Sequence, residues 1–311
     1  MSPAEQSTLP AAVTVTYEPD SAWPERLSAI LAVCPRCIVV DNSVSDEARA
    51  CVRTVVAAQP NTTLIANPDN PGIGRALNQG CQALFAEGRA WVIAFDQDST
   101  PAAGFVAALQ KTATSATGRV AVVGANWRDR ARPDHASRHL RPGPPFGWGF
   151  RRMPADRDLA DVLCVITSGS LFSLEAWHQL GGFDEGLFLD LVDSDFCLRA
   201  RAASWAIAVS AQAKLEHSRG AKRPVHFLGR TFYPAFMPPG RLYGLSRNRI
   251  QLIQRHGGQA PGWVAYEMVY AAKLVADILF LEDRKAAKLA ACLRGTAHGL
   301  FGRKLVRRPA P

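Results

Sequence analysis

Short, nearly continuous apolar runs alternate with segments of helical pattern along the first part of the chain. Four of these runs predict strands buried on both faces of a sheet, at residues 12–17, 37–40, 62–65 and 90–93. The segments between them predict helices, with Ser21 and Pro24 marking the start of the first and Asp46 and Ala57 bounding the second. A third helix is predicted through Asn78 to about Ala86, and a fourth over 102–112. This alternation is typical of an α/β fold with a parallel sheet and helices on both faces.

The pattern changes in the second half of the chain. Further strands are predicted at residues 120–123, 161–165, 169–172 and 206–217, with helices near 175–180 and over 192–204. Residues 125–160 are rich in Pro, Gly, Arg and His and show little periodicity, so they predict a long loop, and such loops are usually functional or mobile. From Gly240 onward the pattern is helical, which predicts a helical C-terminal extension.

The composition is that of a globular protein. With 311 residues, 48% hydrophobic and 20% charged, the chain can bury the core of one large domain or one domain with an appendage. The net charge of +9 favours an anionic partner such as a nucleotide, a nucleic acid or a membrane surface. Seven scattered cysteines argue against a disulfide framework and indicate a reducing compartment. Since no membrane-spanning segment or signal peptide is predicted, we expect a cytoplasmic location.

Two carboxylates follow the fourth predicted strand. Because side chains alternate along a strand, Asp96 and Asp98 point the same way, and ligands of open parallel sheets lie beyond the carboxyl ends of the strands. Paired carboxylates suit a hard divalent cation such as Mg²⁺ or Mn²⁺. In the alternative interpretation, Asp98 and Ser99 cap the helix that Pro101 starts. The short Asp-x-Asp motif leaves both interpretations open.

Three other segments carry candidate chemistry with an open alternative. Gly72 and Gly74 precede a helix, where they fit either a tight turn or contact with a nucleotide, although the third glycine of a redox dinucleotide fingerprint is missing. His217 ends a predicted strand and is by itself more typical of a structural histidine. The basic residues of 241–249 lie beside Tyr243 and suit either a solvated surface or contact with a diphosphate or phospholipid.

Three carboxylates crowd the start of the helix predicted at 192–204. Asp190, Asp193 and Asp195 lie within six positions, where an acid that caps the helix is the default interpretation. Carboxylates in close company raise one another's pKa, which would make one of them a general base near neutral pH. The helix dipole acts in the opposite direction, and the sequence leaves the balance open.

Taken in chain order, these segments resemble the inverting glycosyltransferases of family 2, most of all their rhamnosyltransferase branch. The matching segments span about three quarters of the chain, between residues 12 and 250. They are Val13-Thr14-Val15-Thr16-Tyr17, Val39-Val40-Asp41-Asn42-Ser43, Asn70-Pro71-Gly72-Ile73-Gly74 with Asn78, Phe95-Asp96-Gln97-Asp98-Ser99, Thr167-Ser168-Gly169-Ser170, Gly181-Gly182-Phe183-Asp184-Glu185, Asp190 to Arg199, His217 with Gly220, and Tyr243 with Arg247-Asn248. Each motif is short, but together they follow the order and spacing of that family.

The resemblance implies a GT-A fold, a Rossmann-like domain with a mixed, mostly parallel sheet flanked by helices. This domain would occupy residues 12–250, after an N-terminal tail (1–11) and before a helical extension (251–311). The implied donor-binding residues are Thr16, Tyr17, Asp41, Asn78, Asp96 and Arg247. The implied ligands of the divalent cation, Mg²⁺ or Mn²⁺, are Asp96, Asp98 and His217, and the implied catalytic base is Asp193.

The implied reaction is a single in-line displacement on a nucleoside-diphosphate sugar. Asp193 takes the proton of the acceptor hydroxyl, and thymidine diphosphate leaves with its charge neutralised by the cation. The motif Asp-Gln-Asp-Ser and the later Leu-Phe-Leu-Asp-Leu-Val-Asp favour rhamnose. We therefore expect transfer of L-rhamnose from dTDP-β-L-rhamnose to a saccharide acceptor, lipid-linked, in the synthesis of a surface polysaccharide of the O-antigen type in the cell envelope.

Two alternatives to this function remain. The first is another family-2 transferase that uses a UDP-hexose or a different dTDP-deoxysugar. The second, remote alternative is a nucleic-acid-binding protein, which the net charge would suit, but the basic residues are dispersed and the sequence has no basic–aromatic module.

The C-terminal region carries many basic residues in a helical pattern. They are Arg284, Lys285, Lys288, Arg294, Arg303, Lys304, Arg307 and Arg308. One interpretation is peripheral contact with anionic lipid on the inner face of the plasma membrane, where a lipid-linked acceptor would be found. The other is the solvated face of helices that pack on the catalytic domain.

Overall fold

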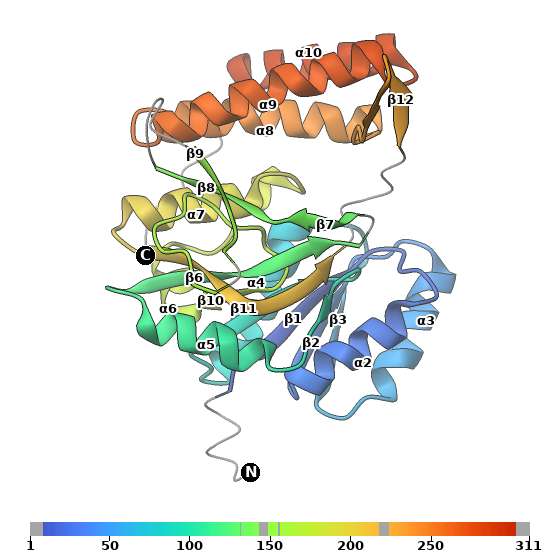
Figure 1. Ribbon diagram of the computed structural model, residues 1–311. Helices are drawn as coiled ribbons and strands as arrows, with labels where there is room; N and C mark the ends of the chain where they lie inside the picture. Colours follow the sequence, from blue (N-terminus) through green and yellow to red (C-terminus); the bar gives the residue numbers. More distant parts are fainter. Residues whose placement is uncertain (1–8, 131, 143–148, 155, 218–223, 303–311) are drawn as a thin grey trace.

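The protein is built around a mixed nine-stranded sheet with helices on both faces, and a layer of three helices lies at one end of the molecule (Figure 1). The computed structural model describes residues 9–130, 132–142, 149–154, 156–217 and 224–302. The predicted basic residues beyond 302, Gly220 and most of the predicted N-terminal tail lie outside these described residues.

The first half of the chain folds as its hydrophobic pattern predicts. Its four strands pair in parallel in the order β3-β2-β1-β4, and they are β1 (Ala11–Thr16), β2 (Cys37–Asp41), β3 (Thr62–Ala66) and β4 (Trp91–Asp96). The intervening helices are α2 (Trp23–Val33), α3 (Asp46–Ala57) and α4 (Ile73–Ala86). Helix α3 begins where expected because the Ser45 side chain accepts a hydrogen bond from the backbone N–H of Ala48, which satisfies one orphan donor of the first turn.

The second half continues the sheet and makes it mixed. Strand β10 (Ser170–Ser173) runs antiparallel between β4 and β6 (Val120–Asp129), while β11 (Ala206–His217) runs parallel to β6. The two-residue strand β5 (Thr100–Pro101) pairs antiparallel with the end of β11. The remaining helices of this half are α5 (Phe105–Ser115), α6 (Leu174–Gln179), the short 3₁₀ turn η1 (Glu185–Leu187) and α7 (Val192–Ala202). A mixed, mostly parallel sheet flanked by helices is the predicted architecture, which is confirmed.

Each face of the sheet carries its own hydrophobic core. Val13 of β1 belongs to the core beneath α4, α6 and α7, whereas its neighbour Ala12 belongs to the core beneath α2, α3 and α5. The rings of Phe172 and Phe196 meet edge to face at 5.5 Å in the first core. Burying a side chain of this size contributes about 1.5–3 kcal/mol. Such two-sided burial explains why the strands are continuous apolar runs rather than alternating ones.

Two predictions for residues 125–165 are wrong. The predicted long loop contains the end of β6, β7 (Arg132–Ala136), and the hairpin of β8 (Arg138–Arg141) with β9 (Gly149–Arg152). These strands are rich in Arg and His, and so polar a sequence does not predict strands. Their pairing depends on the tertiary structure around them. The predicted strand 161–165 is irregular, although Val162 and Leu163 donate single backbone hydrogen bonds to Ile207 and Leu140. The apolar residues of this segment are buried in the core without forming a strand.

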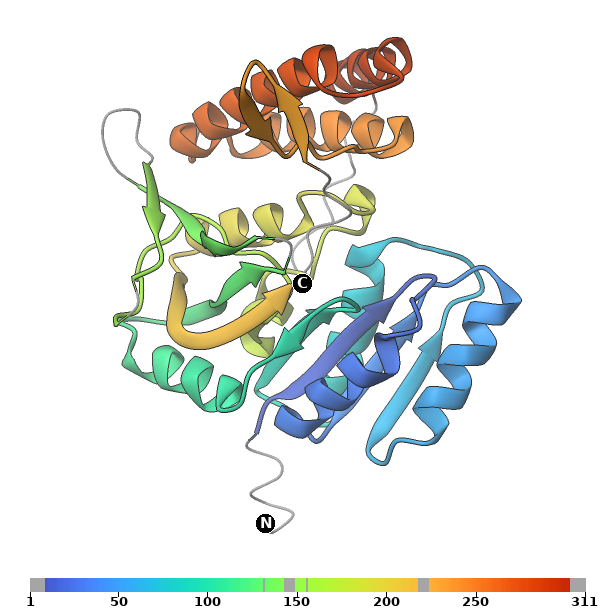
Figure 2. The ribbon, with the colours of Figure 1, turned by 45° about the vertical axis from the view of Figure 1, so that its right-hand side comes forward.

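The C-terminal layer consists of α8 (Pro239–His256), α9 (Pro261–Phe280) and α10 (Lys285–Phe301), which confirms the predicted helical pattern. The predicted domain boundary at residue 250 falls inside α8. A small hairpin of β12 (Val225–Phe227) and β13 (Arg230–Phe232), for which we predicted no element, precedes α8 and lies against the layer (Figure 2). Among the helices described, none combines the length and the apolar character needed to cross a membrane.

Candidate active site

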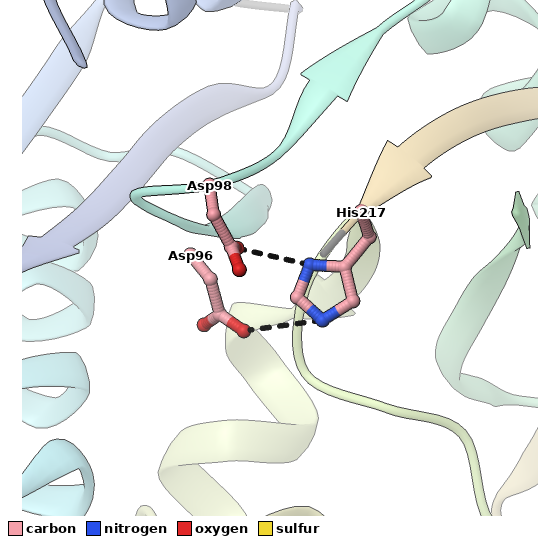
Figure 3. A group of neighbouring side chains, drawn as sticks. All are labelled: Asp96, Asp98 and His217. Atoms are coloured by element: carbon pink, nitrogen blue, oxygen red, sulfur yellow. Dashed lines mark ion pairs between the residues drawn. The ribbon is translucent and has the colours of Figure 1, made fainter. Parts of the chain in front are cut away.

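The predicted metal ligands Asp96, Asp98 and His217 converge at one edge of the sheet (Figure 3). His217 Nδ1 lies 3.0 Å from Asp98 Oδ1, and His217 Nε2 lies 3.9 Å from Asp96 Oδ2. One potential ligand atom from each of the three side chains falls within 4.8 Å of the others. The three residues therefore form a compact cluster with two carboxylates and one imidazole.

Backbone pairing brings this cluster together. Strand β4, which carries Asp96, is separated from β11 by β10 and β6, so sheet order alone would keep His217 away. The β6–β11 pairing shifts register between Val209 and Lys214, a bulge that bends β11 toward the carboxyl end of β4. Strand β5 then pairs Thr100 with Glu216, directly before His217. The tight turn between β4 and β5 consequently holds Asp98 beside the imidazole.

The second alternative for the Asp-x-Asp turn, a helix cap, is wrong. Helix α5 begins at Phe105 after the cap residue Gly104, and no side chain caps it. Ser99 is fully buried, and its hydroxyl lies 3.0 Å from His217 Nδ1 and 2.6 Å from Ser168 Oγ. Ser168 also accepts a hydrogen bond from the backbone N–H of Asp96. Ser99 and Ser168 thus hold His217 and the Asp96 backbone in position through hydrogen bonds. These contacts are long-range, so the sequence does not show them.

The cluster fits a hard divalent cation. Asp98 Oδ1 is buried and receives no hydrogen bond from the part of the chain that the structure describes, since its 3.0 Å approach to the imidazole lacks hydrogen-bond geometry. A buried carboxylate oxygen without a donor is costly unless something else compensates it. The pKa of Asp96 is raised, mainly by desolvation. The positive charges of His217 and Arg241 lower this pKa in part, and the negative charge of Asp98 raises it further. A bound cation would compensate the charge on Asp98 Oδ1 and reduce the repulsion between the two carboxylates.

The three carboxylates at the start of α7 have separate environments. Arg241 makes a two-pronged ion pair with Asp190, with N–O distances of 2.8–3.2 Å. The positive charge of Arg241 also lowers the pKa of Asp96. Asp193 is half-buried in the first turn of α7, where its Oδ1 accepts the backbone N–H of Ser194 at 2.7 Å. Asp193 thus lies three residues after the Asp190–Arg241 pair, and its role as the base stays a prediction.

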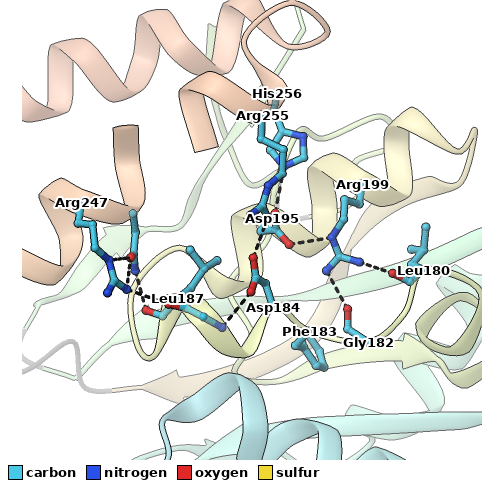
Figure 4. Close-up of polar contacts among 12 residues, drawn as sticks. Leu180, Gly182, Phe183, Asp184, Leu187, Asp195, Arg199, Arg247, Arg255 and His256 are labelled. Atoms are coloured by element: carbon cyan, nitrogen blue, oxygen red, sulfur yellow. Dashed lines mark hydrogen bonds and ion pairs between the residues drawn. The ribbon is translucent and has the colours of Figure 1, made fainter. Parts of the chain in front are cut away.

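Asp195 belongs to a buried ionic network instead (Figure 4). It contacts Arg199 at 2.7 Å, Arg255 at 2.6 Å and His256 at 3.0 Å, and it is fully buried. Burial by itself would raise the pKa of Asp195, but the hydrogen bond from His256 and the charges of Arg199 and Arg255 hold it well below its usual range. The balance that the sequence leaves open falls on the side of a lowered pKa for Asp195, because its cations come from the next turn of α7 and from α8.

Three of the predicted donor-binding residues share the carboxyl edge of β1 and β2. Thr16 donates its hydroxyl to Asp41 Oδ1 at 2.9 Å, and Asp41 is otherwise held by the backbone and hydroxyl of Ser43. Tyr17 is about half exposed. Its backbone N–H donates to the side-chain oxygen of Gln97, and the side-chain amide of Gln97 donates to the Tyr17 carbonyl. We had assigned no role to Gln97, which ties the β1 edge to the Asp96–Asp98 turn.

Two more of the predicted donor residues contact the loop before α7, while the sixth, Asp96, belongs to the cluster with Asp98 and His217. Asn78 donates to the Phe183 carbonyl and to Glu185, and its oxygen accepts from Trp177 and from the Phe183 backbone. Arg247 donates to the Gly186 carbonyl and to its neighbour Asn248. Both side chains fasten the 183–190 loop in place, and their contact with a donor stays a prediction.

Comparisons with known proteins identify the family. A family model described as "Glycosyltransferase like family 2" matches residues 11–228. The dTDP-rhamnosyl transferase RfbF of Shigella flexneri is 26% identical over 240 residues, which cover 71% of this chain and 76% of that protein.

Two solved structures are similar in fold. GalNAc-T7, solved with UDP, GalNAc and Mn²⁺, has a TM-score of 0.57 at 11% identity, covering 79% of this chain and 48% of its own. S. aureus TarS 1–349 in complex with UDP has a TM-score of 0.50 at 13% identity, covering 95% of this chain and 73% of its own. The chain thus spans about half the length of the GalNAc-T7 structure, and identities this low show the fold alone.

Proposed function

The chain belongs to glycosyltransferase family 2, and we propose that it transfers L-rhamnose from dTDP-β-L-rhamnose to a saccharide acceptor with inversion at the anomeric carbon. The observation that carries the choice of sugar is the similarity to the Shigella flexneri dTDP-rhamnosyl transferase over most of both chains. The fold and the transferase activity do not depend on this choice.

Residues at the carboxyl edge of the sheet would bind the donor. Asp41, fixed by Thr16 and Ser43, offers a carboxylate to the base or ribose, and the exposed ring of Tyr17 lies one residue beyond β1. Asp96, Asp98 and His217 would hold Mg²⁺ or Mn²⁺, whose charge neutralises a departing diphosphate. Arg241, which acts on Asp96 while paired to Asp190, would add positive charge on the same side.

The proposed base is Asp193. Its carboxylate would accept the proton of the acceptor hydroxyl while that oxygen bonds to the anomeric carbon and the bond from that carbon to the diphosphate oxygen breaks. One observation supports this assignment. The N–H of Ser194 fixes one carboxylate oxygen of Asp193 in the first turn of α7.

The loop just before α7 would receive the acceptor. Phe188 and Leu189 expose apolar side chains next to the Asp190–Arg241 pair, and Phe188 has a φ of +63°, a strained conformation for an aromatic residue. Exposed apolar groups beside a few fixed polar ones suit the mixed surface of a sugar ring. We propose a lipid-linked saccharide of the surface-polysaccharide type, extended on the cytoplasmic side of the plasma membrane.

A donor panel tests the proposal. The protein is incubated with dTDP-β-L-rhamnose, a second dTDP-deoxysugar and UDP-hexoses, each with and without chelator, and nucleoside-diphosphate release is measured. We expect release from dTDP-β-L-rhamnose, loss of release with chelator and recovery on adding Mg²⁺ or Mn²⁺. Preferential turnover of a UDP-hexose or of the other deoxysugar would contradict the donor assignment, and chelator resistance would contradict the metal assignment.

A further inference from the structure

The outer face of α9 is apolar. Its inner face buries Trp263, Leu274 and Ile278 against the rest of the protein. The opposite face exposes Met268, Val269, Val275, Leu279 and Phe280, with exposed fractions of 37–63%. A helix on the surface of a soluble protein normally turns charged and polar residues outward. Helix α9 is therefore apolar on both sides, although one side faces solvent.

The neighbouring elements extend this surface. Helix α10 exposes Leu293, Leu300 and Phe301, the last at 86%. At the tip of the β12–β13 hairpin Leu228 is 85% exposed, and the ring of Phe227 lies 6.3 Å from that of Phe280 at the end of α9. Exposed apolar side chains gathered on neighbouring elements are typical of an interaction site. We call these exposed side chains of α9, α10 and the hairpin the apolar face of the C-terminal layer.

The charges around the apolar face have one sign. All four acidic residues between 224 and 302 are neutralised by ion pairs, and the pairs are Glu267–Arg249, Asp277–Lys273, Glu282–Lys288 and Asp283–Lys288. Four exposed basic residues have no ion-pair partner within the described ranges, and they are Arg230, Arg284, Lys285 and Arg294. The layer thus offers apolar side chains with uncompensated positive charge around them.

We propose that the apolar face docks the protein on the surface of an anionic lipid bilayer. Exposed leucine and phenylalanine side chains enter the boundary between headgroups and acyl chains, and basic residues at the rim contact anionic headgroups. A second copy of the chain fits less well, because a symmetric dimer would bring the same four cations together with no acid to balance them. This inference concerns the C-terminal layer and does not depend on the sugar donor.

Docking would bring the active site to the membrane. Helix α8 carries Arg241 and Arg247 to the loop before α7, and α10 packs closely along the same helix. A Cβ at Gly295 would meet the Tyr243 carbonyl at 2.3 Å, and one at Gly299 would meet the Arg247 carbonyl at 2.8 Å. Helices α10 and α8 are therefore in contact through their backbones, which couples the exposed side chains of α10 to the helix that carries Arg241 and Arg247.

Vesicle co-sedimentation of the full chain tests the proposal. The probes are phosphatidylglycerol vesicles and phosphatidylcholine vesicles, at low and high salt. We expect binding to phosphatidylglycerol that weakens with salt, and much weaker binding to phosphatidylcholine. The variant Val269→Ser/Leu279→Ser/Phe280→Ser should lower the partition coefficient by at least about tenfold. Replacing Arg230, Lys285 and Arg294 by Gln should lower it by about fivefold per charge on anionic vesicles only.

A matched control keeps the test specific. Val44 is as exposed as these side chains but lies just before α3, outside the C-terminal layer, so Val44→Ser should bind vesicles like the wild type. Unchanged thermal unfolding of each variant shows that the fold is intact. Equal binding of the wild type and the triple serine variant would overturn the proposal. So would a wild-type dimer in sedimentation velocity that the triple variant converts to a monomer, since the face would then bind a second copy.

Discussion

The metal cluster and the Asp195 network use the same kinds of side chain with opposite results. In the cluster, Asp96, Asp98 and His217 bring two carboxylates together, and within the described ranges one buried oxygen of Asp98 receives no hydrogen bond. In the network, one carboxylate is surrounded by Arg199, Arg255 and His256. The first group is short of positive charge and the second is saturated with it. Charge balance, more than residue type, therefore separates a group that binds a ligand from one that holds the fold together.

The largest expected effect is on turnover when the proposed base, Asp193, is replaced. Asp193→Asn should lower turnover by about 10²–10⁴-fold, because it removes the proton acceptor while keeping the shape of the side chain. The measurement is nucleoside-diphosphate release with saturating donor and acceptor, and circular dichroism checks the fold. A variant that keeps most of its transfer rate would show that Asp193 is not the base.

Asp98→Ala tests whether the unpaired oxygen is a metal ligand. We expect turnover to fall on the order of 10³-fold, since a metal that neutralises charge in the transition state supplies several kcal/mol. Titration with Mn²⁺ should show a matching loss of affinity, while the stability of the metal-free protein stays within about 1 kcal/mol. Unchanged metal dependence of turnover would break the contrast with the Asp195 network.

Asp195→Asn should affect stability first. Removing the carboxylate leaves Arg199, Arg255 and His256 without their shared partner, and we expect a loss of about 3 kcal/mol in the free energy of unfolding. Urea denaturation measures it. The control is Asp161→Asn, which breaks an ion pair between Arg201 and a largely exposed carboxylate and should cost less than about 1 kcal/mol. Equal losses in the two variants would mean that the buried network contributes no more than a surface pair.

Ser99→Ala should produce a smaller change, confined to the metal cluster. Loss of the hydroxyl beside His217 Nδ1 frees the imidazole to rotate, and such changes behind a metal ligand typically lower metal affinity by about 10–100-fold. Ser210→Ala removes another buried serine hydroxyl, one that donates to the Ala108 carbonyl, and should leave metal affinity unchanged. Isothermal titration with Mn²⁺ distinguishes the two variants.

The pH dependence of the Asp195 network should be the subtlest effect. The pKa of Asp195 is lower in the folded protein than its unfolded value of about 3.9. A carboxylate of this kind stabilises the fold above its unfolded pKa and loses that contribution as the pH falls toward the folded pKa. The stability difference between wild type and Asp195→Asn should therefore stay constant from neutral pH to about pH 4 and shrink below it. A difference that already fades near pH 6 would contradict the lowered pKa.

The same contrast explains what the sequence could and could not predict. The strands β1–β4 were predictable from local periodicity. The resemblance to family 2 named Asp96, Asp98 and His217 as one set, and the structure brings these three side chains together. Ser99 was assigned to a helix cap as the alternative, since the sequence does not show that Ser168 and His217 approach it from 69 and 118 residues away. The partners of Asp195 were equally hidden, because two of them lie on α8. Long-range polar contacts leave no periodic signal along the chain.

The pairing of β5 with β11 also sets an order on how the protein is made. Strands β1 to β4 are complete once residue 96 has left the ribosome, and they can pair with one another at once. Among the described strands of the main sheet, β5 pairs with β11 alone. This partner is synthesised more than a hundred residues after β5. Closing so long a segment is slow. The Asp96–Asp98–His217 cluster would thus be among the last parts of the sheet to form, and a cation could bind to it in a newly made chain only after the whole sheet has been synthesised.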